Sequence, residues 1–127
     1  MSFDWSQYLR LADELAGKGS TPPSQEAKLR SSVSRCYYAA YCTARNHLRD
    51  IDRIPIPPDD THKFVREKFI NSRDTPRKQI GVSLDRLRID RNRVDYDDVI
   101  DTRRWLPLTT AMDLLMSQQV ISDIGTL

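Results

Sequence analysis

Arg91 is the residue of this chain whose position most strongly indicates chemistry. Apolar residues recur at helical steps through positions 80, 84 and 87, and the next position of that stripe is an arginine. A guanidinium on an inward-facing stripe is costly unless it is paired. Its partner is either a nearby carboxylate, such as Asp95 or Asp97, or the phosphate of a bound RNA or nucleotide.

A second pattern lies on residues 23–50, where arginine, serine and tyrosine recur at helical spacing. Its members are Arg30, Ser34, Tyr38, Tyr41 and Arg45. Tyrosines flanked by arginines are typical of a contact with a second subunit or of a surface on which nucleobases stack. The same pattern also arises when a long helix is covered on both sides within its own bundle. We predict a homodimer with these residues, or the Arg91 helix, near its interface.

Metal and covalent chemistry find little support in the remaining residues. Four aspartates between 95 and 101 resemble a metal cluster, but no glycine-bearing calcium loop accompanies them. His47 and His62 share no ligand spacing, and the chain has no glycine-rich phosphate loop or nucleophile elbow. His62 opens an expected helix, where a capping or partly buried histidine is usual. The prediction is no metal and no cofactor.

Five segments with helical periodicity must position these residues. They cover about 4–16, 23–50, 61–71, 77–93 and 101–124, and most are separated by clusters of glycine or proline. Pro107 lies inside the last segment, so its first turns are expected to be kinked or separate. No alternating β pattern is present. The sequence therefore predicts an all-α fold, an antiparallel bundle of four to five helices.

The core is predicted from the apolar stripes of these segments. The strongest stripe, on residues 23–50, consists of Leu29, Val33, Tyr37, Ala40, Ala44 and Leu48. In the last segment the expected inward positions are Leu108, Ala111, Leu115 and Val120 or Ile121. Cys36 and Cys42 are six residues apart and diverge by about 240° on a helix, so they cannot pair within it. They are predicted to be small core residues.

Size and charge place limits on the function. The 127 residues suit one domain, covering residues 1–127, and no apolar run is long enough for a membrane span. No signal peptide is visible, and the predicted location is cytoplasmic. The net charge is only +2, but residues 61–93 hold ten basic and four acidic residues, a local net of +6. Such a segment either attracts phosphates or is a set of solvated helix faces.

Three stretches of sequence resemble HEPN-domain proteins. Residues 29–41, LRSSVSRCYYAAY, are similar to the family's RSAISRAYYAAF helix, and THKFV at 61–65 is similar to its histidine-bearing third helix. RNRVDYD at 91–97 looks like the RNxADYD segment of one branch of the family. Order and spacing agree over roughly residues 5–122.

The resemblance implies a helical bundle that usually dimerises, with the arginine motifs of both subunits facing one cleft. Many such domains are toxins or defence ribonucleases encoded beside a small nucleotidyltransferase antitoxin. In active members an Arg-Asn-x-x-x-His motif cleaves RNA without a metal, the arginine stabilising phosphate charge and the histidine handling a proton. Arg91 and Asn92 match this motif, but Tyr96 stands at the histidine position, and a phenol is a poor base at neutral pH.

Three functions follow from these observations. The first is an RNA- or nucleotide-binding domain of the HEPN type, the toxin-like half of a two-gene system. Its predicted contacts are Arg91, Arg93, Arg88, His62 and Lys63. The second is a metal-independent endoribonuclease using Arg91. The third is a helical protein-interaction module in which Arg91 only closes a salt bridge.

Overall fold

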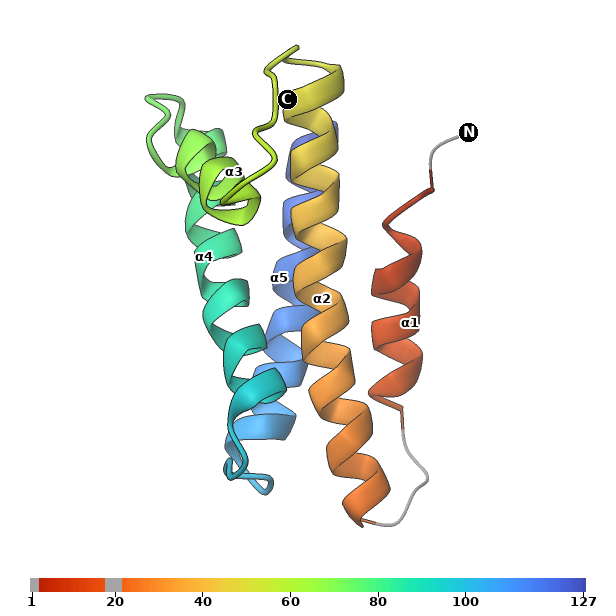
Figure 1. Ribbon diagram of the computed structural model, residues 1–127. Coiled ribbons are helices and arrows are strands. Elements are labelled where there is room, and N and C mark those ends of the chain that lie inside the picture. The colour runs from red at the N-terminus through yellow and green to blue at the C-terminus, as the bar shows by residue number, and fades with distance from the viewer. Residues whose placement is uncertain (1–2, 18–21) are drawn as a thin grey trace.

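Every other helix packs against α2 (Pro22–Asp50), the longest helix of the chain. The computed structural model describes residues 3–17 and 22–127. Around α2 lie α1 (Gln7–Leu15), α4 (Thr75–Tyr96) and α5 (Trp105–Gly125), and consecutive long helices run in opposite directions (Figure 1). The described residues form helices and no strands, so the predicted all-α bundle is confirmed. None of the helices in this part of the chain is both long and apolar enough to span a membrane.

The short helix α3 (Thr61–Ile70) carries His62 and packs on the upper part of α4 (Figure 1). It approaches α4 closely at Gly81, where an added Cβ would overlap the backbone of Ile70. The segment before α3 contains three prolines, and Thr61 Oγ1 donates to the carbonyl of Pro57 over 3.0 Å. These contacts fix where α3 begins, and therefore where His62 lies.

Local sequence explains how α4 and α5 begin. Asp74 caps α4 by accepting a hydrogen bond from the Arg77 amide at 3.2 Å, with a proline in the first turn. The predicted start of the last helix at residue 101 is wrong, because residues 101–104 form a turn in which Asp101 Oδ1 accepts two backbone amides. Pro107 is the third residue of α5, where its missing N–H leaves no helical bond unmade.

The main core surrounds α2. All six residues of its predicted stripe are buried, and so are both cysteines, which are free thiols. Those predictions are confirmed. From Tyr37 onward the stripe packs against Val65 and Phe69 of α3, Ile80, Leu84 and Leu87 of α4, and Val120 and Ile124 of α5. Leu29 and Val33 pack instead with Val94, Ile100 and Leu106.

The predicted inward face of the last helix is mostly wrong. Leu108 and Leu115 are 63% and 67% exposed, and Ala111 is exposed as well, while Val120 is buried as expected. The buried residues of α5 are instead Leu106, Thr109, Thr110, Asp113, Ser117, Val120 and Ile124. Two of these polar side chains donate to backbone carbonyls, Thr110 Oγ1 to Leu106 at 2.7 Å and Ser117 Oγ to Cys36 at 2.8 Å, whereas Oδ2 of Asp113 is buried without a hydrogen-bond partner.

Candidate functional site

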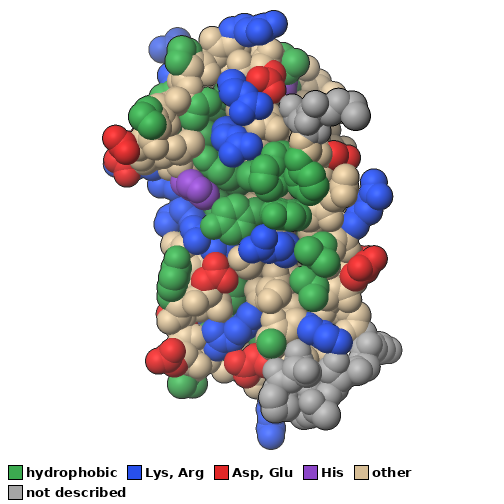
Figure 2. Space-filling model, turned by 45° about the vertical axis from the view of Figure 1, so that its right-hand side comes forward, with side chains coloured by type: hydrophobic (Ala, Val, Ile, Leu, Met, Phe, Trp, Pro, Cys, Tyr) green, Lys and Arg blue, Asp and Glu red, His purple; other side chains and the backbone are tan. Residues whose placement is uncertain are grey.

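A pocket of about 510 Å³ opens where α1, α2 and the start of α3 meet. Figure 2 shows this face, with apolar and aromatic side chains gathered around a histidine and interleaved with basic groups. The residues lining it are Trp5, Tyr8, Arg35, Tyr38, Tyr41, Cys42, Arg45, Thr61 and His62. None of these lining residues is acidic. The pocket therefore combines aromatic surface with positive charge.

His62 lies flat against Tyr41, with ring centroids 3.9 Å apart and an interplanar angle of 5°. Its Nδ1 shares a hydrogen bond with the Tyr37 hydroxyl. Burial lowers the pKa of His62, and the positive charges of Arg91 and Arg45 lower it further, so the ring is neutral at pH 7. Burial also raises the pKa of Tyr37, which keeps its proton. The Tyr37 hydroxyl then donates the hydrogen bond and His62 Nδ1 accepts it, so the ring hydrogen is on Nε2.

Two arginines of the pocket each lie between an aromatic ring of α2 and one near the N-terminus. The Arg35 guanidinium is 4.9 Å from the ring centroid of Tyr8 and 5.3 Å from that of Tyr38. The Arg45 guanidinium is 5.6 Å from Trp5 and 6.0 Å from the Tyr41 ring. Cation–π contacts of this kind hold a guanidinium by its faces. The N–H groups point outward in the plane of the guanidinium. Those of Arg45 are partly engaged, because its Nε and Nη2 donate to Asn46 Oδ1 at 3.1 and 3.0 Å, so a phosphate would meet its remaining N–H groups.

Arg91 is partly buried, with 14% of its side chain exposed, in keeping with its place on the apolar stripe. Its guanidinium lies over the rings of Tyr37 and Tyr38, at 5.1 and 5.5 Å. The nearest carboxylate oxygen, from Asp95, is 3.9 Å away, and that carboxylate also accepts from Ser34 at 3.3 Å. The Nε of Arg91 is buried without a hydrogen-bond partner. The salt bridge is therefore long, at the limit for an ion pair, and the guanidinium also lies over two aromatic rings.

The structure brings some of the predicted site residues together. Arg91 and His62 both contact Tyr37, although they are 29 positions apart in the sequence. Tyr96 does not join them, because its side chain is 73% exposed and leaves α4 about 140° around the helix from Arg91. Asn92 is half-buried and points about 100° away from Arg91. The sequence motif 91–96 does not form one cluster in the protomer.

The other predicted RNA contacts lie outside the pocket. Arg88 pairs with Asp85 at 2.9 Å, and Arg93 lies 4.2 Å from the centroid of the Trp105 ring, beside α5. Lys63 is exposed on α3. More generally, six of the ten basic residues in the segment 61–93 form ion pairs with aspartates. Much of that segment is thus an ion-paired surface.

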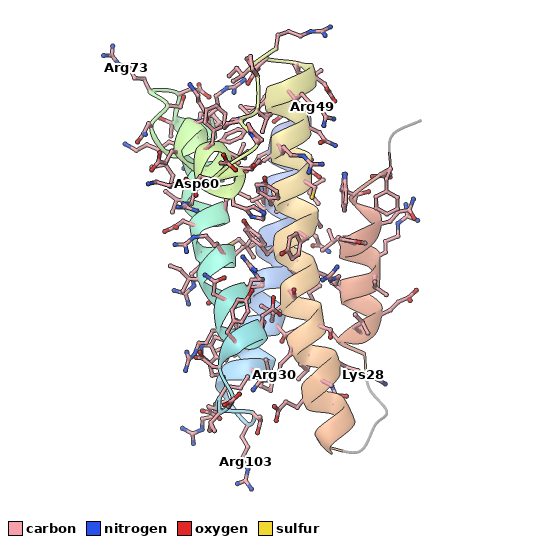
Figure 3. The ribbon with its side chains drawn as sticks, in the orientation of Figure 1. Lys28, Arg30, Arg49, Asp60, Arg73 and Arg103 are labelled. Carbon is pink, nitrogen blue, oxygen red and sulfur yellow. The ribbon has the colours of Figure 1, made fainter. Side chains whose placement is uncertain are left out.

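The polar stripe of α2 divides between two roles. Arg30 donates to the carbonyls of Val94 and Asp97 at 2.8 and 2.7 Å, joining α2 to the end of α4 (Figure 3). Ser34 is buried beside α4. The remaining three members, Tyr38, Tyr41 and Arg45, line the pocket. Within this protomer the stripe is largely covered by the chain's own helices.

Five residues of the pocket are not among the predicted site residues, namely Trp5, Tyr8, Arg35, Cys42 and Thr61. Trp5 and Tyr8 lie at the start of the first predicted helical segment, and Arg35 belongs to the family-like motif 29–41. The signal for Arg35 is its spacing, because 35, 38, 42 and 45 follow one face of α2 as regularly as the stripe that begins at Arg30. Its aromatic partner Tyr8 depends on where α1 docks, which spacing along α2 does not reveal.

Residues 3–17 and 22–127 contain no group of three His, Cys, Asp or Glu side chains arranged to hold a metal ion. Comparisons of the chain with protein-family models, curated proteins and solved structures found no match. The resemblance to HEPN-domain proteins therefore rests on the residues of the chain alone.

Proposed function

We propose that the chain binds RNA or a nucleotide in this pocket, as a HEPN-type domain. An unpaired base would stack on the partly exposed rings of the pocket, such as those of Tyr8 and Tyr38, and its phosphate would accept hydrogen bonds from Arg35 and Arg45. The observation that carries the proposal is the pair of arginines clamped between aromatic rings with no acidic residue lining the pocket. Aromatic stacking together with arginine–phosphate contacts is the usual chemistry of single-strand recognition.

The size and charge of the pocket favour an unpaired base over a duplex. Its volume is within the ordinary range for small-ligand sites, about 300–1,000 Å³. Bases inside a duplex are stacked on one another and cannot enter such a hollow. Arg91 adds positive charge behind the wall formed by Tyr38, to which its Nη1 donates at 3.5 Å.

A second candidate function is metal-independent RNA cleavage. It is favoured by the arrangement of His62 and Arg91 around Tyr37, since a neutral histidine accepts a proton and an arginine stabilises phosphate charge. In this reading His62 replaces the histidine that the family motif would place at position 96. Cleavage in the presence of a chelator, lost on His62→Gln, would establish it.

The biological setting proposed from the resemblance is the toxin-like half of a two-gene system in the cytoplasm. Its partners would be a second copy of the chain and a nucleotidyltransferase antitoxin. A nucleotidyltransferase gene beside this one would support the setting. An unrelated neighbour and no RNA binding would instead favour a helical interaction module.

Binding is tested by fluorescence anisotropy with a labelled single-stranded oligoribonucleotide at low salt. We expect Arg45→Gln to weaken binding at least about tenfold, since it removes a charge-assisted hydrogen bond. Arg49→Gln is the matched control, one helical turn further along α2 and paired with Asp50 at the surface. Competition by a free nucleoside monophosphate would identify a nucleotide site, and its failure would favour the RNA strand. Equal binding by both variants would contradict the proposal.

A further inference from the structure

The outward face of α5 has a composition that its position does not explain. Leu108, Met112 and Leu115 follow one another at steps of four and three residues, and they are 63%, 48% and 67% exposed. The inner face of the same helix buries Thr109, Thr110, Asp113 and Ser117. Leu106, Val120 and Ile124 are also buried, so α5 carries large apolar side chains on both its inner and its outward face, whereas a surface helix of a monomer is polar on its outward face.

Charge is absent from this outward face. The residues on it are Leu108, Ala111, Met112, Leu115, Gln118, Gln119 and Ser122. Depletion of charged residues is a feature of the centres of protein–protein interfaces. Because the face is uncharged, two copies of it can approach each other without repulsion.

We propose that this face is the contact between two copies of the chain, which pair their α5 helices antiparallel across a twofold axis. Steps of three and four residues are those of a helix–helix seam. Across a twofold axis, the register that sets Met112 against Leu115 of the partner subunit also sets Arg104 against Asp123 of the partner subunit. Arg104 and Asp123 are opposite charges at opposite ends of α5. The apolar register and the charge pairing therefore agree.

The available area indicates how strong the contact is. α5 has 21 residues and is about 31 Å long, so a strip about 10 Å wide covers roughly 300 Å². A standard interface buries about 800 Å² on each partner, so α5 alone is too small. The neighbouring helix α4 exposes Val82 and Ile89, by 57% and 47%. With α4 included, the contact reaches the small end of the range, that of a reversible dimer.

This contact is separate from the proposed RNA site. The face of α5 that meets α2 is the buried one, and the pocket opens where α1, α2 and the start of α3 meet. The dimer is therefore expected whether or not the pocket binds RNA, and each proposal has its own test.

The test is sedimentation velocity of the full chain from low to several hundred micromolar. We expect a reversible dimer in the micromolar range, and Leu115→Glu should raise its dissociation constant at least about tenfold by placing a charge in an apolar contact. Ile51→Glu is the matched control, because Ile51 at the end of α2 is also 67% exposed and lies off this face. Circular dichroism checks that both variants keep their helices.

A charge exchange tests the register. Arg104→Glu and Asp123→Lys should each weaken the dimer, and the double variant should restore the dissociation constant of the unmodified chain. A monomer at every concentration would overturn the proposal, and so would a dimer that Leu115→Glu leaves intact. A dimer sensitive to Leu115→Glu, but with no rescue in the double variant, would overturn the antiparallel register.

Discussion

Replacing Asp113 by asparagine should stabilise the protein at neutral pH. Asp113 of α5 and Asp90 of α4 are 1% and 3% exposed, and their carboxyl groups are in hydrogen-bond contact between the two helices. Burial, and after it the neighbouring Asp90, together raise the pKa of Asp113 from 3.8 to about 9. Two buried carboxylates side by side cannot both be ionised at low cost, so the pair retains a proton at pH 7.

The sign of the pH dependence follows from this raised pKa. The unfolded chain loses the Asp113 proton near pH 3.8, whereas the folded chain keeps it until about pH 9. Below pH 3.8 the group has no effect on stability, and between the two values the free energy of unfolding falls as the pH rises. At pH 7 the pH is about three units above the pKa of Asp113 in the unfolded chain. The free energy of unfolding is therefore lower than at acidic pH by roughly 4 kcal/mol as an upper value.

Asparagine removes this effect while keeping the packing. Its amide has nearly the shape of the carboxyl group and can still donate to Asp90, but it has no proton to lose. We expect Asp113→Asn to raise the free energy of unfolding by about 2–4 kcal/mol at pH 7 and by almost nothing near pH 4. Urea unfolding at pH 7 and near pH 4 measures the free energy of unfolding of each variant, with Asp123→Asn on the same helix as the control.

Two results would refute the reasoning. One is a loss of stability in Asp113→Asn at pH 7, which would mean that the carboxylate is ionised and held by the nearby Arg86 Nε, 3.4 Å from Asp90. The other is an unmodified chain whose stability does not fall between pH 5 and pH 8. The outcome also bears on the site, since Asp90 is the direct neighbour of Arg91 on α4.

Four further predictions concern the pocket. Arg91→Ala should lower the free energy of unfolding by only about 1–2 kcal/mol, because it removes two cation–π contacts and leaves Asp95, which is partly exposed, without its arginine. The same change should lower RNA affinity at least about tenfold. A stability loss nearer 5 kcal/mol would show that Arg91 is mainly a structural ion pair. RNA affinity should rise as the pH falls below 6.5. The lowered pKa of His62 keeps the ring neutral in the free protein, and a bound anion favours the charged ring. His62→Gln should therefore abolish this rise in anisotropy titrations. Affinity should drop about tenfold or more between 50 and 200 mM salt, and a flat response would argue against phosphate contacts. Tyr96→His should create no cleavage in a chelator-containing RNA assay, because that side chain is 73% exposed.

The sequence was sufficient to predict the helices and the face that α2 buries. Its stripe from Leu29 to Leu48 is apolar at nearly every inward position, so the period is unambiguous. The last helix gave a different result, because Leu108 and Leu115 lie outside and its buried positions include Thr109, Asp113 and Ser117. A stripe of leucines has the same period whether it faces the core or a partner, and the pattern alone does not distinguish the two.

The site was predictable only in part for a related reason. Arg91 was identified because an arginine breaks an apolar stripe, which is a local signal within one helix. The contact of His62 with Tyr37 depends instead on the position of α3, which is set by the proline segment before it and by the close approach at Gly81. Likewise, Trp5 and Tyr8 become site residues only through the docking of α1 on α2. Contacts between helices carry this information, and single-helix periodicity does not.

The pocket arginines show how one set of residues can hold the fold and still bind a ligand. The faces of Arg35 and Arg45 are covered by rings of α1 or its N-terminal turn and of α2, which fastens that end of the chain to the bundle. A guanidinium donates hydrogen bonds only from its edge, so ring contacts with its faces do not consume its donors, although Nε and Nη2 of Arg45 already donate to Asn46 Oδ1. The stacking also fixes the side-chain rotamers before any ligand arrives, and this reduces the entropy lost on binding. Phenylalanine at position 8 or 41 should therefore preserve RNA affinity, while alanine at either position should weaken both RNA binding and the attachment of α1, measured by anisotropy and by thermal unfolding.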